Sequence, residues 1–173
     1  NFNRLALDRV DTFSTTIEEY LARETLRDRI QEIPISSNSV DPFEGTKTTK
    51  QFYTVVLDGS FWAGEWTKVR VFLETDGVLQ LVMSGRHVTE KKQLIQSLPI
   101  SNNARDISIS YYGRATLDQP QMWHPTWSGN KVLPDLVKME WNSASGLPAP
   151  PITLVPGKDE IQRYMSRSSL IPP

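Results

Sequence analysis

The sequence predicts an α+β fold in which an N-terminal amphipathic helix packs on an antiparallel β-sheet head. Residues 5–33 contain no glycine or proline and are rich in Leu, Arg and Glu, which is the composition of a helix. Beyond residue 50 the chain changes to short runs in which apolar and polar residues alternate, as in half-buried strands. We therefore expect one domain over 1–173, built of a helix (1–33), a polar loop (34–50) and a β-rich head (51–173).

Length and charge limit the possible functions. A chain of 173 residues is the usual size of one domain, and it can bury about 70% of its surface without a disulfide. The formal net charge is −1, which lacks the basic excess that nucleic-acid binding requires. There is no cysteine, and no stretch approaches the roughly 20 apolar residues that span a bilayer. We expect no nucleic-acid partner and no disulfide or thiolate chemistry.

The apolar residues of the predicted helix fall on two nearly opposite faces, at 100° per residue. The early stripe is Val10, Phe13, Ile17, Tyr20 and Leu21. The late stripe is Ala22, Leu26, Ile30 and Ile33. One interpretation is that the helix packs on its own domain at one end and on another molecule at the other. The alternative is a kinked helix, or one sunk in the core.

Pro34 ends the helix, and the polar residues after it predict a loop. The pair Asp76-Gly77 predicts a tight turn between two strands of a hairpin. Residues 113–130 predict an aromatic loop or irregular hairpin, and 158–165 a short final helix. Strands are expected over six segments: 51–57, 67–74, 78–83, 106–112, 136–141 and 152–155.

Motifs for catalysis and cofactor binding are missing. The nine glycines form neither a P-loop nor a dinucleotide fingerprint, and no GxSxG elbow occurs. His87 and His124 lie 37 positions apart, too far for one helix to present both to a metal. We interpret both as ordinary surface or packing histidines. The sequence predicts a non-enzyme with no catalytic residue, metal site or cofactor.

Two aromatic clusters stand out. Phe61, Trp62 and Trp66 surround a short Ala-Gly-Glu segment, and Trp123 and Trp127 flank a proline-rich turn. Such clusters can stack on sugars or anchor partners, but core packing is the favoured interpretation.

The carboxyl-terminal half carries a family resemblance. Residues 106–113 read Asp-Ile-Ser-Ile-Ser-Tyr-Tyr-Gly, followed by Trp123, Trp127 and the run Leu-Pro-Asp-Leu-Val-Lys-Met-Glu-Trp over 133–141. This pattern resembles the minor pseudopilin J family of type II secretion systems, whose heads carry an aromatic-ended strand, one or two tryptophans and an LPxxV element. The family is type IV pilin-like, so the resemblance implies a pilin-like fold.

The resemblance also implies a function. It places a periplasmic head on a helix anchored in the inner membrane, at the pseudopilus tip, in a complex with pseudopilins of the I and K types. Such a protein helps to initiate the fibre and to export proteins, with secreted cargo as a further partner. The early stripe, Val10, Phe13, Ile17, Tyr20 and Leu21, would bind a neighbouring pseudopilin, and the late stripe would pack on its own sheet.

Family members start with a basic leader and about 20 apolar residues, which this chain lacks. The expectation is a soluble fragment that begins just after the membrane segment, so that the missing segment is the only contact with a membrane.

The main alternative is a small-ligand carrier with a lipocalin-like β-barrel. Gly64-Glu65-Trp66 matches a GxW opening, and the strands that follow are antiparallel. The motif lies far into the chain, after a helix and a polar loop, whereas a lipocalin opens its barrel almost at once.

Overall fold

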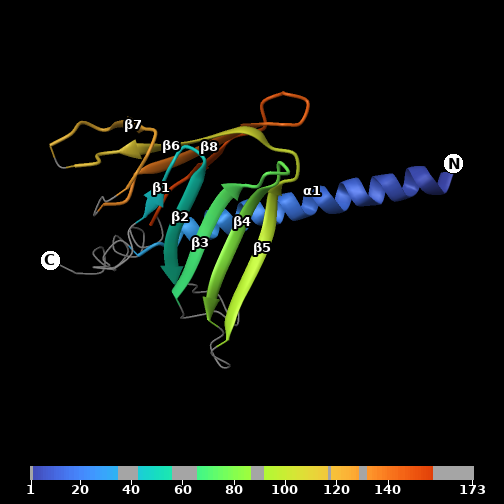
Figure 1. Ribbon diagram of the computed structural model, residues 1–173, viewed down its shortest axis with the longest axis horizontal. Helices are drawn as coiled ribbons and strands as arrows, with labels where there is room; N and C mark the ends of the chain where they lie inside the picture. Colours follow the sequence, from blue (N-terminus) through green and yellow to red (C-terminus); the bar gives the residue numbers. More distant parts are fainter. Residues whose placement is uncertain are drawn as a thin grey trace, which may run out of the picture.

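The computed structural model describes residues 2–34, 43–55, 66–86, 92–116, 118–128 and 132–157, with the side chains of α1 described from residue 16 onward. Figure 1 shows one long helix beside a β-rich head. The elements are α1 (Phe2–Gln31), β1 (Glu44–Gly45), β2 (Thr49–Val55), β3 (Trp66–Leu73), β4 (Leu79–Arg86), β5 (Gln93–Ser101), β6 (Arg105–Gly113), β7 (Met122–His124), β8 (Leu136–Asn142) and β9 (Ile152–Leu154).

The strands form two sheets. The first has the order β1-β2-β3-β4-β5 and the second the order β7-β6-β8-β9, and all their pairings are antiparallel. In the described part of the chain both sheets end in edge strands, so neither closes into the barrel that the lipocalin-like alternative requires.

The predicted fold class, a pilin-like α+β fold with the helix packed on an antiparallel sheet, is wrong. The protein is mostly antiparallel β-structure in two sheets, with one helix in the described residues. After β5 the chain turns at Asn102 and Asn103 and passes through Asp106, which has a φ of 52°. β6 then pairs with β7 and β8 instead of β5. Alternation along a strand shows which face is wet but not which strand lies beside it, so the sequence did not reveal the second sheet.

The helix lies at the edges of both sheets. Its main contacts are with β5, an edge strand of the first sheet, and it also touches β9, an edge strand of the second. The late stripe faces this junction, because Ala22, Leu26 and Ile30 are fully buried and Ile33 is nearly so. At the helix end, the backbone N–H of Gly157 donates to the carbonyl of Ile30 at 3.0 Å. The predicted helix and the buried late stripe are thus confirmed.

The hairpin around Asp76-Gly77 is confirmed. Gly77 has a φ of 88°, which favours glycine, and its N–H donates to the Glu74 carbonyl at 3.0 Å. The Asp76 carboxylate accepts a hydrogen bond from the N–H of Val78 at 3.2 Å. Val69 and Val71 on β3 then face Met83 and Leu81 on β4. These four side chains are buried and form the inner surface of the first sheet.

The predicted strands occur within a few residues of their expected bounds wherever the chain is described, but β1, β5 and β7 were not predicted as strands. β1 and the first two residues of β2 lie in the segment 34–50, which was expected to be a loop. β5 contains Gln, Ser and Pro99, which obscure its alternation. A proline is tolerated here because β5 is an edge strand and its register shifts nearby at Leu79 and Gln80. The expected helix over 158–165 lies outside the described residues.

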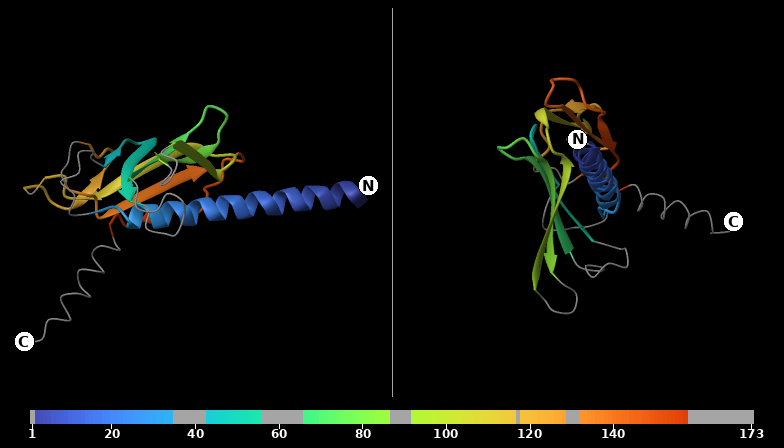
Figure 2. Two further views of the ribbon diagram at one scale, coloured as in Figure 1. Left: turned by 90° about the horizontal axis from the view of Figure 1, so that it is seen from below. Right: turned by 90° about the vertical axis from the view of Figure 1, so that its right-hand side faces the viewer.

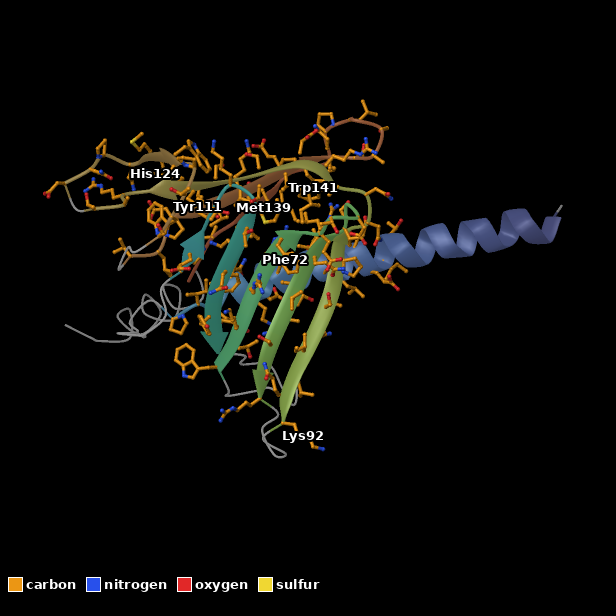
Figure 3. The ribbon with its side chains drawn as sticks, in the orientation of Figure 1. Phe72, Lys92, Tyr111, His124, Met139 and Trp141 are labelled. Atoms are coloured by element: carbon orange, nitrogen blue, oxygen red, sulfur yellow. The ribbon has the colours of Figure 1, made fainter. Side chains whose placement is uncertain are left out.

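The two sheets join at one end of the core. The backbones of Gly45 and Trp127 exchange two hydrogen bonds, of 2.7 and 2.8 Å. The Tyr111 hydroxyl donates to the Thr46 carbonyl at 2.9 Å. A Cβ on Gly45 would overlap the Tyr111 ring, so only glycine fits this crossing. Figure 3 labels Tyr111, Met139 and Trp141 along the second sheet, and all three are buried.

Candidate interaction surface

The early stripe of α1 is exposed wherever its side chains are described. Ile17 is 42% exposed, Tyr20 62% and Leu21 54%, which is unusual for three apolar side chains at i, i+3 and i+4 spacing. Val10 and Phe13 lie in α1 but in the stretch whose side chains are not described. The structure therefore brings three of the five predicted partner-binding residues onto one outward face.

The helix leaves the head close to this stripe. The Glu19 carboxylate accepts a hydrogen bond from the backbone N–H of Asn102 at 2.8 Å. One turn later, the Arg23 guanidinium lies 5.1 Å from the ring centre of Trp141, and its Nε is 3.4 Å from the Ile100 carbonyl oxygen. Towards the N-terminus the helix extends beyond the sheets (Figures 1 and 2). These contacts hold the base of the helix while leaving its outer side open.

Such a surface suits a second helix. Residues at i, i+3 and i+4 form a ridge that can fit the groove of another helix, and apolar burial would drive the contact at about 25 cal/mol per Å². Burial of the late stripe fixes the orientation of the early stripe, because the two lie on opposite sides of α1. The arrangement can therefore bind a partner but supplies no group for chemistry.

The core contains a buried lysine that the sequence did not predict. Lys50 is fully buried on β2, where it shares the inner face with Phe52 and Thr54. Its Nζ lies 2.7 Å from the ring centre of Phe43, 4.8 Å from that of Tyr111 and 5.9 Å from that of Phe52. Among the described residues this amine has no hydrogen-bond partner. Residue 50 was expected to lie in a loop (34–50), whereas β2 begins at Thr49. The alternation of Lys50 with Phe52 is the pattern that indicates a shared face of the strand.

Burial lowers the pKa of Lys50 well below its usual value. An aromatic cage favours a cation by about 2 kcal/mol when water is excluded, whereas burying an ammonium costs several kcal/mol. The desolvation cost is larger, so burial disfavours the charged form of this amine. Since the amine is fully buried, no substrate reaches it in this structure, and it belongs to the core.

The tryptophans divide into two groups. Trp127 and Trp141 are buried, as the core-packing interpretation predicts, and Trp127 donates from its indole N–H to the Val132 carbonyl at 3.0 Å. Trp66 and Trp123 are about half exposed, so core packing does not explain them. Phe61 and Trp62 lie outside the described residues.

His124 is half-buried, with its Nε2 3.2 Å from the Gly113 carbonyl oxygen and its ring edge-on to Trp127. This matches its interpretation as a packing histidine, and His87 lies outside the described residues.

In the part of the chain that the structure describes, no three metal-binding side chains gather into a possible ion site. The described helix is not apolar enough over a sufficient length to cross a membrane.

No protein-family model matches the sequence, and no curated protein matches it.

Proposed function

We propose that this protein is a non-enzymatic structural component of the type II secretion pseudopilus tip, where it assembles with other minor pseudopilins through α1. The observation that carries the proposal is the exposed early stripe, of which Ile17, Tyr20 and Leu21 are described, opposite a buried late stripe. The proposal also rests on the resemblance of residues 106–141 to the minor pseudopilin J family. The pilin-like fold class that the resemblance implies was wrong, so the proposal is supported by these two observations alone.

In this proposal, the partners are pseudopilins of the I and K types, which pack their own helices against the early stripe. The head lies in the periplasm, and the full-length protein is anchored in the inner membrane. The complex initiates the fibre and promotes protein export, with secreted cargo as a further partner. No cofactor is required, because the proposed assembly depends only on the packing of apolar side chains.

The proposal is tested by replacing Ile17 and Tyr20 with aspartate. A charge in the centre of an apolar helix contact must be buried without a partner, which costs several kcal/mol of binding. The double variant I17D/Y20D should therefore lose the complex with I-type and K-type pseudopilins in size-exclusion chromatography with light scattering. Its melting transition should stay within a few degrees of the unmodified protein, because both side chains are exposed.

Val132 supplies a matched control. It is 49% exposed, close to the value for Ile17, but lies on the segment before β8. Val132→Asp should leave the complex intact. Equal loss of binding in both variants, or retention of binding by I17D/Y20D, would refute the role of the early stripe.

A further inference from the structure

The outer face of the five-stranded sheet has an ordered arrangement of rings and cations. Along β3, Thr67, Val69 and Val71 are buried, so the alternate residues point to the other side of the sheet. In chain order these are Trp66, Lys68, Arg70 and Phe72, which we call the basic–aromatic row. Trp66 is 51% exposed, Arg70 is exposed, and the other two are half-buried. Figure 3 labels Phe72 within this sheet.

The neighbouring strands extend this face with side chains that carry no negative charge. Lys68 pairs with Tyr53 on β2 and with Ser84 on β4, and Ser84 pairs with Ile95 on β5. Ile95 is 70% exposed, the highest value among the large apolar side chains of the described residues. Arg86, two residues beyond Ser84, is exposed and adds a third cation to the same side.

The charged groups of Lys68 and Arg70 contact aromatic rings and, in the described part of the chain, do not pair with carboxylates. The Lys68 Nζ lies 5.7 Å from the ring centre of Tyr53, and the Arg70 Cζ lies 5.1 Å from that of Phe72. Among the described residues neither forms an ion pair. Glu44, on the edge strand β1, is the carboxylate that register places nearest to Arg70, with Gln51 between them. The charges of this face are therefore available to a ligand.

The spacing of the row fits an extended polypeptide. Alternate residues of a strand lie about 7 Å apart on one face. An extended polypeptide has the same repeat, so two of its carboxylates at i and i+2 match Lys68 and Arg70. Apolar side chains two residues further out on each side would then meet Trp66 and Phe72. The complementary sequence is apolar-x-acidic-x-acidic-x-apolar.

The charge of the rest of the chain argues for a short segment. The whole chain carries a net charge of −1, so the chain without Lys68, Arg70 and Arg86 carries −4. The net negative charge of the remaining chain repels a long polyanion more strongly than a short acidic segment. A short acidic segment contacts the cations alone.

We propose that the outer face of the five-stranded sheet binds an extended acidic segment of a partner protein, with its two carboxylates on Lys68 and Arg70 and its apolar residues on Trp66 and Phe72. This surface is separate from the early stripe of α1. The proposal therefore goes beyond the proposed function, and the two can fail independently.

The experiment measures binding of a fluorescein-labelled peptide, Leu-Ser-Glu-Ser-Glu-Ser-Leu, to the full chain by fluorescence anisotropy. The double variant K68E/R70E should bind it at least about tenfold more weakly, and a peptide with Gln for both Glu should lose a similar factor. A peptide with Lys for both Glu should bind K68E/R70E better than it binds the unmodified protein. Binding should weaken as salt rises from about 0.05 to 0.2 M.

Arg114→Glu is the matched control, because Arg114 is exposed and lies just beyond β6 in the second sheet. This variant should bind the peptide like the unmodified protein. Trp66→Ala should weaken binding without changing its salt dependence. Circular dichroism melting curves confirm that each variant is folded.

Three results would overturn the proposal: no saturable binding of the acidic peptide, equal affinities for K68E/R70E and the unmodified protein, or a labelled oligothymidylate that binds this face more tightly than the peptide. The last result would identify a nucleic-acid surface instead.

Discussion

Replacing Lys50 with methionine should stabilise the protein, although Lys50 is a fully buried residue of the core. Methionine has a similar length and fills the space between Phe43, Phe52 and Tyr111 without carrying a polar group into it. The amine that it removes is fully buried and lacks a hydrogen-bond partner among the described residues. An unsatisfied buried polar group costs about 1–3 kcal/mol, so we expect a gain of at least that size near pH 7.

The gain should depend on pH in a defined direction. Burial lowers the pKa of Lys50, whereas an unfolded lysine titrates near its usual value of 10.5. Between the lowered pKa and pH 10.5 the unfolded state therefore binds one more proton than the folded state. In this window the free energy of unfolding rises by about 1.4 kcal/mol per pH unit. Lys50→Met should remove this slope, so its advantage is largest at low pH and shrinks towards pH 10.5, where only the cost of the unsatisfied neutral amine remains.

Urea denaturation of both proteins between about pH 6 and pH 9.5 is the assay. The upper limit avoids Tyr111, whose pKa is raised by burial. Above pH 10 an unfolded tyrosine loses a proton that the folded one keeps, so stability falls there for a different reason. A pH-independent difference between the proteins, or a less stable Lys50→Met at every pH, would show that the amine is a stabilised cation and would refute the reasoning.

Three further predictions concern the core and can be checked by urea denaturation at neutral pH. Tyr111→Phe removes the hydrogen bond to the Thr46 carbonyl and should cost about 0.5–1.5 kcal/mol; no change would mean that water replaces the hydroxyl. Gly45→Ala places a methyl group against the Tyr111 ring and should cost about 1–3 kcal/mol, and a neutral result would mean that the ring can move aside. Leu26→Ala should cost about 2–5 kcal/mol, whereas Leu21→Ala on the same helix should stay within about 0.5 kcal/mol, and similar costs would contradict the assignment of buried and exposed faces.

Local patterns predicted local structure well. The late stripe of α1, the turn at Asp76-Gly77 and the alternation of Ile107, Ile109 and Tyr111 each depend on residues close in sequence, and the structure confirms them. Helix periodicity also separated the early stripe from the late one, because a change of face is visible in spacing alone.

Features that depend on distant residues were not predicted. The division into two sheets follows from which strands pair, and β6 pairs with β8 across an intervening loop and strand. The cage around Lys50 combines Phe43 and Phe52 with Tyr111 of the other sheet. β5 was missed because Gln, Ser and Pro99 interrupt its pattern, and its position at an edge permits that composition.

The most direct test of the central claim is photo-crosslinking from the early stripe. A benzoylphenylalanine introduced in place of Ile17, and in a second variant in place of Val132, is irradiated in the presence of I-type and K-type pseudopilins, and the products are identified by mass spectrometry. We predict that the probe at position 17 crosslinks to the helix of a partner pseudopilin and that the probe at position 132 does not. Absence of a crosslink from position 17, or equal crosslinking from both positions, would contradict the assignment of α1 as the assembly surface.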